Sequence, residues 1–395
     1  MLIIVYLKLI NKVDNYLMKI SLITSSHFSF DERIYHHMAN SLLSNGFSPQ
    51  VISSFNKPQI HSNGRIKDAS FHENHISKSE KIIQFIKRLK QFNPSIIICS
   101  SPLTVYAAHK YKKTNTVKIV YDITEFYPSK KHLRNHKVPT RWLHFIKYYL
   151  YNLYALKLSD AFIFGEYYKS KTPKLLFPNK KYEYISYYPK LELFKQNKPK
   201  EKINSLNLSF SGPISIEKGF LNFINVVKSI NEISPKTKIS IKIIGDFVKN
   251  DKLVCTKAIQ EIKSKCKIEI FKFQPLSMYL ELIKDTDIFM DLRSIDFENS
   301  HCLPIKLYYY IALERPIIFS NLKAISKSIN IQKFGKLVDP TDSNKIAKII
   351  LIYVKNPDLY IKHCQIANQE FKSKYNWQQI ENNFLDFLTS MNNGK

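Results

Sequence analysis

Residues 299–320 read NSHCLPIKLYYYIALERPIIFS and combine a polar loop, a short helix and a buried strand. Pro304 suits the first turn of a helix, and residues 306–313 supply the helical run. Pro316 ends that run before the apolar strand at 317–320. In doubly wound sheets, ligands bind at loops between a strand and a helix. We therefore expect this stretch to hold a ligand.

The N-terminal half of the chain alternates strands with helices. It opens with a strand at 20–24, a helix at 33–43, a turn at Asn45-Gly46 and a strand at 50–53, which together make a βαβ unit. The pattern then predicts helices at 78–91, 102–112 and 142–158, and strands at 95–100, 118–122, 161–165 and 184–187. Such alternation is typical of an α/β doubly wound domain.

The C-terminal half repeats the alternation after a polar segment, FKQNKPKEKIN, at 194–204 that reads as an interdomain linker. Strands are predicted at 206–210, 238–244, 268–271, 288–292 and 317–320, and helices at 219–230, 255–264, 275–285 and 305–313. The tail from 357 to 391 reads as two helices. We expect an N-terminal domain at 18–193, a second domain at 205–370 and a final helical segment at 371–395.

The first 17 residues fit poorly with this plan. Their apolar run is broken by Lys8, is too short to span a bilayer and lacks a small-residue cleavage site. Met18-Lys19 reads as the natural start of the first strand. Residues 1–17 are therefore interpreted as an N-terminal extension.

Bulk composition excludes some classes of protein. A hydrophobic content of 44% rules out global disorder, and 395 residues suit two domains. The formal net charge of +28 raises nucleic acid as a partner, but the lysines are dispersed as on a solvated surface rather than gathered in one run. Nucleic acid is therefore not expected. A basic surface also attracts anionic lipid headgroups, at about 1 kcal/mol per well-placed Lys or Arg, so an anionic membrane surface is kept as a candidate partner.

Neither a metal nor a cofactor is expected. The five cysteines, Cys99, Cys255, Cys266, Cys302 and Cys364, contain no CxxC pair, which argues against a disulfide framework or a zinc site and favours a reducing cytoplasm. The one DxD triplet, 285–287, falls before a strand, where a turn or capping role is expected. The glycine run of an NAD site is missing after the first strand, and no HExxH, nucleophile elbow or P-loop occurs.

The stretch at 299–320 resembles the donor-sugar signature of family 4 and family 4-like glycosyltransferases of the GT-B fold, which reads like LPNKLFEYMALGKPVIAS. Tyr309 stands where that family carries a glutamate, and Glu314 where it has a glycine. Further resemblances occur in order along the chain, from Met18 onward. They are the opening at 18–47 with Asp31-Glu32-Arg33, a DxHE-like element at 121–125 with Thr124 for histidine, Ser211-Gly212-Pro213 through Glu217-Lys218-Gly219, and Gly245-Asp246.

This resemblance implies a GT-B architecture, with two Rossmann-like doubly wound domains facing a central cleft and a final helix that crosses back to the first domain. It also implies a retaining transfer of sugar from a nucleotide-sugar donor.

The donor site is expected in the second domain. A departing diphosphate needs Arg, Lys, a metal or a helix N-terminus to neutralise it. Lys218 and Lys306 both lie at predicted helix starts, and for each the alternative is an ordinary surface lysine. Arg293 follows a strand, with an ion pair to Asp291 or Asp296 as its alternative. The resemblance adds four donor-binding positions: Gly212, at the opening of the second domain, and Asn299, Leu303 and Pro304 in the donor loop.

Tyr309 is the main chemical departure in that site. In the family, the glutamate at this position holds ribose hydroxyls and an acidic partner about two turns upstream meets the sugar. Tyr309 can donate or accept one hydrogen bond or stack its ring, but it cannot accept two as a carboxylate does. The upstream position falls near His301, with Glu298 close by. The alternative for Tyr309 and its tyrosine neighbours is ordinary packing into the core.

Acceptor-binding candidates lie in the first domain. Glu125 follows a strand end and is expected to bind the acceptor or to act as a base, with a cap or an ion pair to Lys130 or Lys131 as the alternative. Asp31 suits an N-cap as well as acceptor contact, and Arg33 is expected to contact the acceptor.

Residues 129–158 form a basic loop followed by an aromatic helix. That composition is typical of an interfacial membrane helix. The alternative is a helix that buries its aromatic face against the sheet.

Taken together, the sequence predicts a hexosyl- or related glycosyltransferase with Lys218, Lys306 and Glu125 as catalytic residues. It would move a sugar from a nucleotide-sugar to a polysaccharide or lipid-linked acceptor in cell-surface polysaccharide synthesis, such as O-antigen or capsule. The expected location is the cytoplasm, peripheral at the inner face of the plasma membrane. Alternatives are a catalytically weak GT-B protein that serves as a binding partner in a glycosylation complex, a nucleotide-sugar epimerase, and a nucleic-acid-binding protein recognisable by one contiguous basic face.

Overall fold

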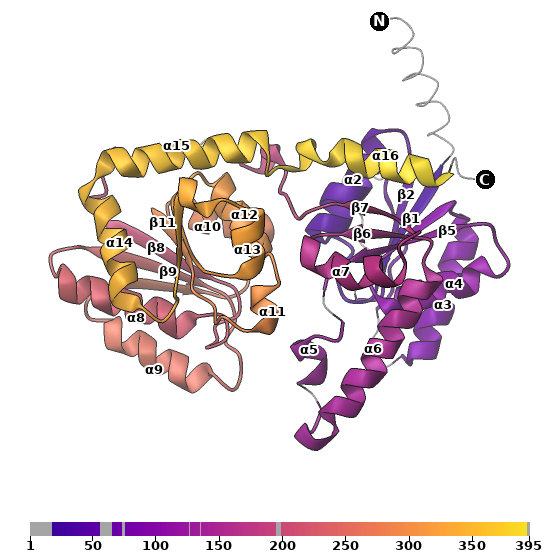
Figure 1. The fold of residues 1–395 in the computed structure, drawn as a ribbon, viewed down its shortest axis with the longest axis horizontal. Coiled ribbons are helices and arrows are strands. Elements are labelled where there is room, and N and C mark those ends of the chain that lie inside the picture. The colour runs from indigo at the N-terminus through magenta and orange to yellow at the C-terminus, as the bar shows by residue number, and fades with distance from the viewer. Residues whose placement is uncertain are drawn as a thin grey trace, which may run out of the picture. The chain divides into compact units, whose positions relative to one another are not determined.

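The chain folds into two compact units. A computed structural model describes residues 18–55, 65–72, 76–125, 127–134, 136–194 and 199–392 (Figure 1). The first unit ends at Tyr187 and takes in the segment from Ile380 onward, and the second is Tyr188–Gln379. This division comes before the 194–204 segment that was expected to be the linker, and residues 195–198 of that segment lie outside the described residues. The extension predicted at 1–17 also lies outside them.

The first unit contains one parallel sheet and its covering helices. Its elements are β1 (Lys19–Thr24), the π-helix η1 (Glu32–Ala39), α2 (Asn40–Ser44), β2 (Ser48–Ser53), β3 (Lys67–Asp68), α3 (Lys78–Phe92), β4 (Ile96–Cys99), α4 (Pro102–Lys112), β5 (Lys118–Ile123), α5 (Lys130–Leu133), η2 (Val138–Thr140), α6 (Arg141–Leu158), β6 (Ala161–Phe164), α7 (Tyr167–Leu176), β7 (Lys181–Tyr184) and α16 (Glu381–Asn392).

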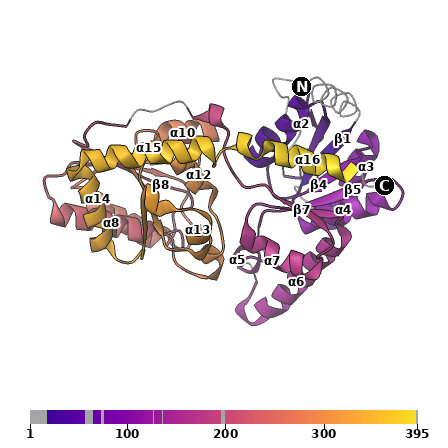
Figure 2. The ribbon, with the colours of Figure 1, turned by 45° about the horizontal axis from the view of Figure 1, so that its top comes forward.

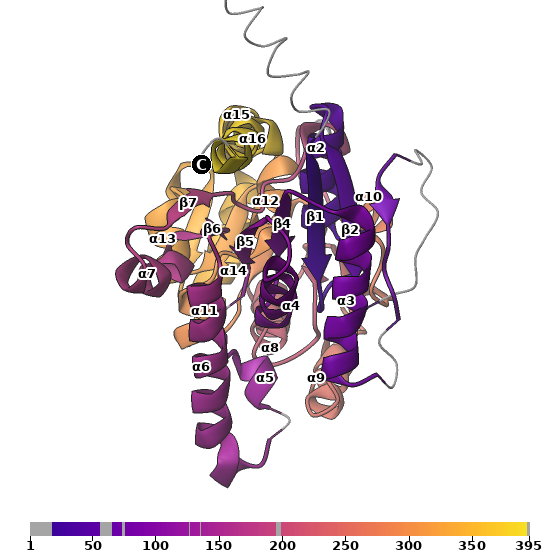
Figure 3. The same cartoon turned by 90° about the vertical axis from the view of Figure 1, so that its right-hand side faces the viewer.

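The strands of the first unit lie in the order β3-β2-β1-β4-β5-β6-β7, and every pairing is parallel. Apolar residues of α3, α4 and the C-terminal end of α6 share one core with the sheet. The N-terminal part of α6 runs away from the sheet (Figure 3). Both faces of a parallel sheet must be covered, because its strands are apolar throughout.

The final helix, α16, packs in the first unit against β7 and α2 (Figure 2). Its buried face carries Phe384 and Leu388. The ammonium of Lys181, on β7, donates to the carbonyl of Ser390 at 3.0 Å. The first unit is therefore built from two separate parts of the chain.

The second unit is a second α/β sandwich. Its elements are η3 (Leu191–Leu193), β8 (Leu206–Ser211), α8 (Phe220–Ile233), β9 (Ile239–Ile244), α9 (Lys252–Ile262), β10 (Lys267–Phe271), α10 (Leu276–Ile283), β11 (Ile288–Asp291), α11 (Phe297–Ser300), α12 (Ile305–Ala312), β12 (Ile317–Ser320), α13 (Lys323–Ser328), η4 (Ile331–Lys333), β13 (Gly335–Val338), α14 (Ser343–Lys355), α15 (Pro357–Ser373) and η5 (Trp377–Gln379).

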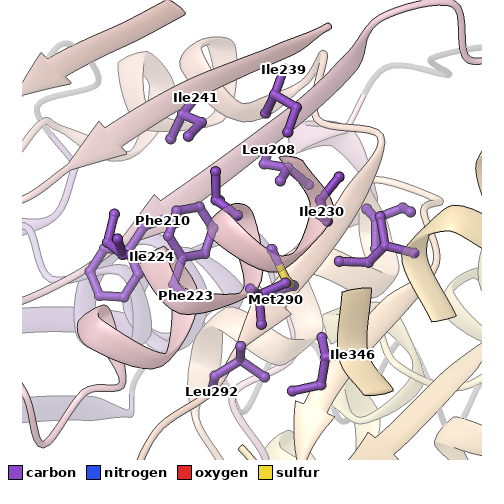
Figure 4. Close-up of a cluster of buried hydrophobic side chains, with 14 of the residues drawn as sticks. Leu208, Phe210, Phe223, Ile224, Ile230, Ile239, Ile241, Met290, Leu292 and Ile346 are labelled. Atoms are coloured by element: carbon purple, nitrogen blue, oxygen red, sulfur yellow. The ribbon is translucent and has the colours of Figure 1, made fainter. Parts of the chain in front are cut away.

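The strands of the second unit lie in the order β10-β9-β8-β11-β12-β13, again all parallel. One face of this sheet forms a core with α8, α9 and α14, part of which is shown in Figure 4. Leu208 and Phe210 of β8, Met290 of β11 and Ile346 of α14 all belong to this core. The fold is the two-domain α/β fold that was predicted from the alternating pattern.

Successive side chains of β8 and β11 point to opposite faces of the sheet, so the residues between the core positions lie on the face away from α8. Leu208 and Phe210 point to the α8 side, so Ser211 points to the opposite side, where its hydroxyl is 2.9 Å from that of Tyr310. In the same way Met290 faces α8, while Phe289 stacks on the Tyr310 ring with centroids 4.2 Å apart. Polar residues at the ends of these strands therefore face α12.

Several elements differ from the sequence prediction. The last strand of the first sheet is β7, three residues before the predicted 184–187. The structure adds elements that were not predicted, among them β3, α7, α13, β13 and α14. A π-helix spans Glu32–Ala39, where an α-helix was expected, and the amide of Asn40 bonds to the carbonyl of Tyr35. π-Helical turns are rare in proteins, and those that do occur are frequently at functional sites.

Candidate functional site

The strand order of the second sheet marks a place for a ligand. The chain moves outward from β8 through β9 to β10 and then returns to β11 on the other side of β8. Loops that follow β8 and β11 therefore leave in opposite directions and open a crevice at the carboxyl ends of these strands. Except for Tyr309, which lies in the middle of α12, the predicted donor residues lie in these two loops and at the start of α12.

A buried cluster of one carboxylate and two cations occupies this edge. Arg293 donates from Nε and Nη2 to the two oxygens of Asp291, at 2.8 and 2.6 Å. Nζ of Lys306 lies 3.3 Å from Oδ2 of Asp291 and donates to the carbonyl of Ser211. Asp291 and Arg293 are buried, whereas the side chain of Lys306 is 22% exposed. The cluster therefore carries an excess positive charge, and its accessible member is Lys306.

The pKa shifts of Asp291 and Lys306 reflect these contacts. Burial alone would raise the pKa of the Asp291 carboxyl, but Arg293 and Lys306 outweigh burial and hold that pKa well below its usual range. Burial lowers the pKa of the Lys306 ammonium from its ordinary value, and Asp291 opposes that shift. An anion beside Lys306 would be stabilised more here than in water, since the surroundings are largely protein.

Gly212 gives the backbone its approach to Lys306. Its φ of +109° lies in a region that L side chains rarely adopt, and a Cβ there would lie 3.3 Å from Nζ of Lys306. The preceding Ser211 hydroxyl lies 3.0 Å from the Tyr279 hydroxyl as well as near Tyr310. The end of β8 is thus held through Ser211 by the two tyrosine hydroxyls, while Gly212, which has no side chain, leaves room for the ammonium of Lys306.

Lys218 lies at the neighbouring loop, as the sequence suggested. Gly219, with φ +79°, is the N-cap of α8, and a Cβ on it would meet the carbonyl oxygen of Leu292 at 2.0 Å. The Ser294 amide donates to the Glu217 carbonyl at 3.2 Å, which ties the loop after β8 to the loop after β11. Nζ of Lys218 lies 3.0 Å from Oε1 of Glu217 and donates to Oδ1 of Asn299 at 3.4 Å.

The remaining predicted donor positions of the loop are buried. Asn299 is buried, and its backbone amide donates to Oδ1 of Asp296, the N-cap of α11, at 3.0 Å. Leu303 is buried, and Pro304 is the N-cap of α12. The two positions discussed as upstream partners, Glu298 and His301, lie on α11 and at its C-cap. Asn299 of this loop contacts Lys218, and Lys306 follows the loop in the first turn of α12.

Tyr309 is packed among other aromatic side chains. Its side chain is only 5% exposed, and its ring lies 6.2 Å from that of Tyr279 and 6.3 Å from that of Phe194. Tyr308 and Tyr310 are also buried, against Tyr188 and Phe289 respectively. Core packing, the alternative considered for these tyrosines, describes their positions.

In the first unit, Arg33 is paired with Asp122 across the sheet edge. Nε and Nη2 of Arg33 each donate to one Asp122 oxygen at 2.8 Å, and the guanidinium lies 4.7 Å from the centroid of the Tyr187 ring. Burial lowers the pKa of Arg33, but Asp122 raises it above its ordinary value. Arg33 and Asp122 are both buried, so this pair shapes the site.

Asp31 and Glu125 lie near this pair. Oδ1 of Asp31 accepts from the amides of Arg33 and Ile34, at 3.0 and 3.2 Å, so Asp31 is the N-cap that was considered. Burial alone would lower the pKa of His27, but Asp31, 3.4 Å away, and more weakly Glu125 raise it. Glu125 is exposed at the end of β5. An accessible carboxylate and a histidine therefore share this edge.

Two features were not found from the sequence. Asp291 was noted only as a partner of Arg293, although it also restrains Lys306. In the first unit, Lys169 and Glu166 form a buried ion pair, and Lys169 also donates to the carbonyl of Thr124. Their spacing of three on α7 and its N-cap is a weak signal in a chain with so many lysines.

The acidic triplet at 285–287 has a structural role. Oδ2 of Asp287 accepts from the Asn207 amide at 2.8 Å, and Oδ1 lies 2.8 Å from Nζ of Lys200. Within the described ranges, no three His, Cys, Asp or Glu side chains are grouped so as to hold a metal ion.

No protein-family model matches the chain, and no curated protein matches it in sequence. Solved structures do. Sucrose-phosphate synthase from Thermosynechococcus elongatus is 12% identical with a TM-score of 0.70, over 95% of this chain and 99% of that one. HepE from Anabaena, in complex with UDP and glucose, is 13% identical with a TM-score of 0.67, over 94% and 100%.

A third structure, the lipopolysaccharide outer core galactosyltransferase WaaB, is 14% identical with a TM-score of 0.63, over 95% of this chain and 100% of that one. The predicted fold class is thereby confirmed, because the two parallel sheets with flanking helices match the two Rossmann-like domains of GT-B glycosyltransferases.

Proposed function

We propose that the protein is a glycosyltransferase that moves a sugar from a nucleoside-diphosphate sugar to a glycan or lipid-linked acceptor. The observation that carries the proposal is the cationic edge of the second sheet, where Lys306 and Lys218 lie at the crevice between the loops after β8 and β11. A departing nucleoside diphosphate is a concentrated anion, and preorganised cations stabilise it without reorganisation.

Each residue at this sheet edge has a separate role in the proposal. Lys306 would bind the diphosphate directly, because its ammonium is held by Ser211 and Asp291 yet stays accessible. Lys218 would bind the same group from the neighbouring loop. Arg293 is committed to Asp291 through two hydrogen bonds, so its role is to hold the carboxylate that positions Lys306. Gly212 would allow the phosphate to approach the backbone.

The first unit is proposed to bind the acceptor. Glu125 is exposed and lies near His27, so it can accept a hydrogen bond from an acceptor hydroxyl. Arg33 would act through its pair with Asp122 rather than by direct contact, since it is buried.

The finer points of the proposal rest on the resemblance of the 299–320 stretch to family 4 enzymes. They are retention of anomeric configuration, transfer of a hexosyl or related group, synthesis of a cell-surface polysaccharide such as O-antigen or capsule, and a cytoplasmic site of action without a bound metal. WaaB, which has the same fold, is a lipopolysaccharide galactosyltransferase by its name, and this supports a surface-glycan role.

Thermal unfolding with nucleotides tests the donor site. Purified protein is heated with UDP, GDP, ADP or CMP, and UDP is the first choice because HepE was solved with it. A ligand at roughly 100 times its Kd should stabilise the native state by about 2.7 kcal/mol. A rise in Tm with one nucleotide, absent in Lys306→Ala but kept in the exposed-surface control Lys323→Ala, supports the proposal. No rise with any nucleotide contradicts it.

A second candidate is a catalytically weak binding partner in a glycosylation complex. The burial of Tyr309, at the position where family 4 enzymes carry a ribose-binding glutamate, favours it. This candidate predicts that nucleotide-sugars neither shift Tm nor lose their sugar to any acceptor or to water. Release of an isomerised sugar without an acceptor would instead indicate epimerisation.

A further inference from the structure

Helix α6 carries an apolar surface that the fold leaves uncovered. Trp142, Ile146, Leu150 and Tyr154 follow one another at spacings of four and are 61%, 46%, 57% and 46% exposed. Residues four apart lie side by side on a helix, so these side chains form one continuous stripe along its length. We call them the α6 stripe.

Other apolar side chains are exposed around the N-terminal turns of the helix. Leu143 and Phe145 are also exposed, and the ring of Phe145 stacks on that of Tyr149 with centroids 6.3 Å apart. Val138, in the turn before the helix, is exposed as well. Isolated exposed apolar residues are ordinary on proteins, but a contiguous set of this kind marks an interaction surface.

The side of α6 opposite the stripe makes the contacts that hold the helix to the first unit. Ala155 and Leu156 are buried in the core of the first unit, and the Asn152 side chain accepts from the Tyr121 hydroxyl at 3.1 Å. Nearer the start of the helix, the Tyr148 hydroxyl lies 3.2 Å from Nε2 of His136. These contacts fix one side of the helix and turn the stripe outward.

The charge around α6 identifies the class of partner. From Lys130 to Leu158 the chain has seven lysines and arginines, Lys130, Lys131, Arg134, Lys137, Arg141, Lys147 and Lys157, and no aspartate or glutamate. A protein partner that buried the stripe would have to neutralise these charges locally. A bilayer with anionic headgroups offers an apolar boundary and negative charge together.

The dimensions of the helix suit a surface position. Its 18 residues span about 27 Å. Throughout the described part of the chain, no helix has the length and apolar character needed to cross a bilayer. Trp and Tyr side chains favour the headgroup level, where their rings are apolar and their polar atoms remain hydrated.

We propose that α6 lies in the surface of an anionic lipid bilayer, with the α6 stripe inserted at the headgroup boundary and the surrounding Lys and Arg side chains at the phosphates. The helix projects from the first unit beyond its sheet, so this contact needs no rearrangement of that unit (Figures 1 and 3). The proposal is independent of sugar transfer and is tested without it.

Vesicle binding of the full chain is the experiment. Protein is centrifuged with sucrose-loaded vesicles of phosphatidylcholine alone or of phosphatidylcholine with phosphatidylglycerol. We expect binding to the anionic vesicles, weakened by salt. The variant Ile146→Ser/Leu150→Ser should bind roughly tenfold more weakly or worse. Its matched control is Ile83→Ser/Leu253→Ser, which changes two exposed aliphatic residues on α3 and α9 and should bind as the parent does.

Charge is tested separately. Arg141→Gln/Lys147→Gln should weaken binding to the anionic vesicles roughly 30-fold at low ionic strength. The control is Lys87→Gln/Lys90→Gln on α3, where two exposed lysines lie away from α6. Equal losses from both pairs would overturn the proposal, since binding would then follow net charge and not this helix.

Tryptophan fluorescence reports the contact itself. Of the two tryptophans in the chain, Trp142 is in the stripe, whereas Trp377 is 1% exposed in the second unit. On binding, the emission should shift to shorter wavelength, and lipids with brominated chains should quench it. Binding without either change overturns the proposal because the stripe then stays in water. A concentration-dependent dimer that dissociates in Ile146→Ser/Leu150→Ser would also overturn the proposal, because the stripe would then bind a second copy of the chain and not a bilayer.

Discussion

Nζ of Lys306 lies 3.3 Å from Oδ2 of Asp291, the carboxylate that Arg293 already holds through two hydrogen bonds. One buried anion thus restrains two cations at the carboxyl edge of the second sheet. The anion is committed to the protein, and the ammonium of Lys306 keeps a side open. A phosphate arriving there meets an ammonium whose position is already fixed, so little conformational entropy is lost on binding.

Removal of the two lysines is the most direct test of the site. Lys306→Ala should lower transferase turnover by roughly 100-fold or more, because loss of one preorganised donor to a developing anion costs about 2.7–4 kcal/mol. Lys218→Ala should have a smaller effect in the same direction, since its side chain is shared with Glu217 and Asn299. Turnover and Tm are measured together with Lys323→Ala as control. Unchanged turnover in both lysine variants would remove them from the donor site.

Asp291→Asn should destabilise the second unit. It leaves Arg293 and Lys306 without their carboxylate, and breaking a buried ion pair from one side typically costs about 3–5 kcal/mol. The free energy of unfolding in urea measures this cost, and Asp285→Asn, in an exposed turn, is the control.

The same carboxylate gives a pH dependence. The pKa of Asp291 is lowered in the folded state, so its contribution to stability is present above the unfolded value of 3.8 and is lost as the pH falls through the lower folded value. The difference in unfolding free energy between parent and Asp291→Asn should therefore shrink as the pH falls below about 4. A difference that stayed constant with pH would contradict the charged pair.

Arg33→Lys tests the pair in the first unit. A lysine cannot reproduce the two parallel bonds to Asp122, so we expect a loss of about 1–3 kcal/mol, and a larger loss for Arg33→Met. Urea unfolding measures both, with the exposed Arg134→Lys as control. Acceptor KM should rise in Arg33→Lys while the nucleotide-induced shift in Tm is unchanged. Equal stability of Arg33→Lys and Arg134→Lys would show that the bidentate geometry is unimportant.

Glu32, at the start of the π-helix, should destabilise the protein at neutral pH. Burial, with a smaller effect of Asp31, raises the pKa of Glu32 to about 8 from 4.5. The folded state therefore binds the proton more tightly, so stability is fully present below 4.5 and falls as the pH rises towards 8. Glu32→Gln should be more stable than the parent above about pH 6, by on the order of 1–2 kcal/mol, and the gain should vanish near pH 4. Thermal unfolding at several pH values checks this, with the exposed Glu201→Gln as control.

The sequence predicted those elements of the fold that carry a strong local signal. Pro304 and Pro316 bracket α12, and buried runs such as residues 288–291 read clearly as strands. The edge strands β7 and β13 were harder. In β7 the residues Lys181 to Tyr184 are exposed or half-buried, so the apolar pattern that normally marks a strand is weak. In β13 only Gly335 and Val338 are buried, which explains why that strand was missed.

The candidate site shows a similar limit. Lys218 and Lys306 were found because they lie at predicted helix starts and a family signature marked their positions, whereas Arg293 was found because it follows a predicted strand. The structure brings all three to one edge. The importance of Asp291 depends on the meeting of β11 with α12, a tertiary contact that no local pattern contains. Tyr309 illustrates the converse, because its match by position says nothing of the direction of its side chain, which is set by packing against Tyr279 and Phe194.

The position of α16 has a consequence for how the protein is made. Because α16 packs against β7 and α2 while all of the second unit lies between them in the chain, a ribosome must synthesise residues 188–379 before the first unit can close. Until then, the surface that Phe384 and Leu388 will cover is exposed on the nascent chain. The second unit is contiguous and can complete its fold without α16, so the unit translated earliest is completed last.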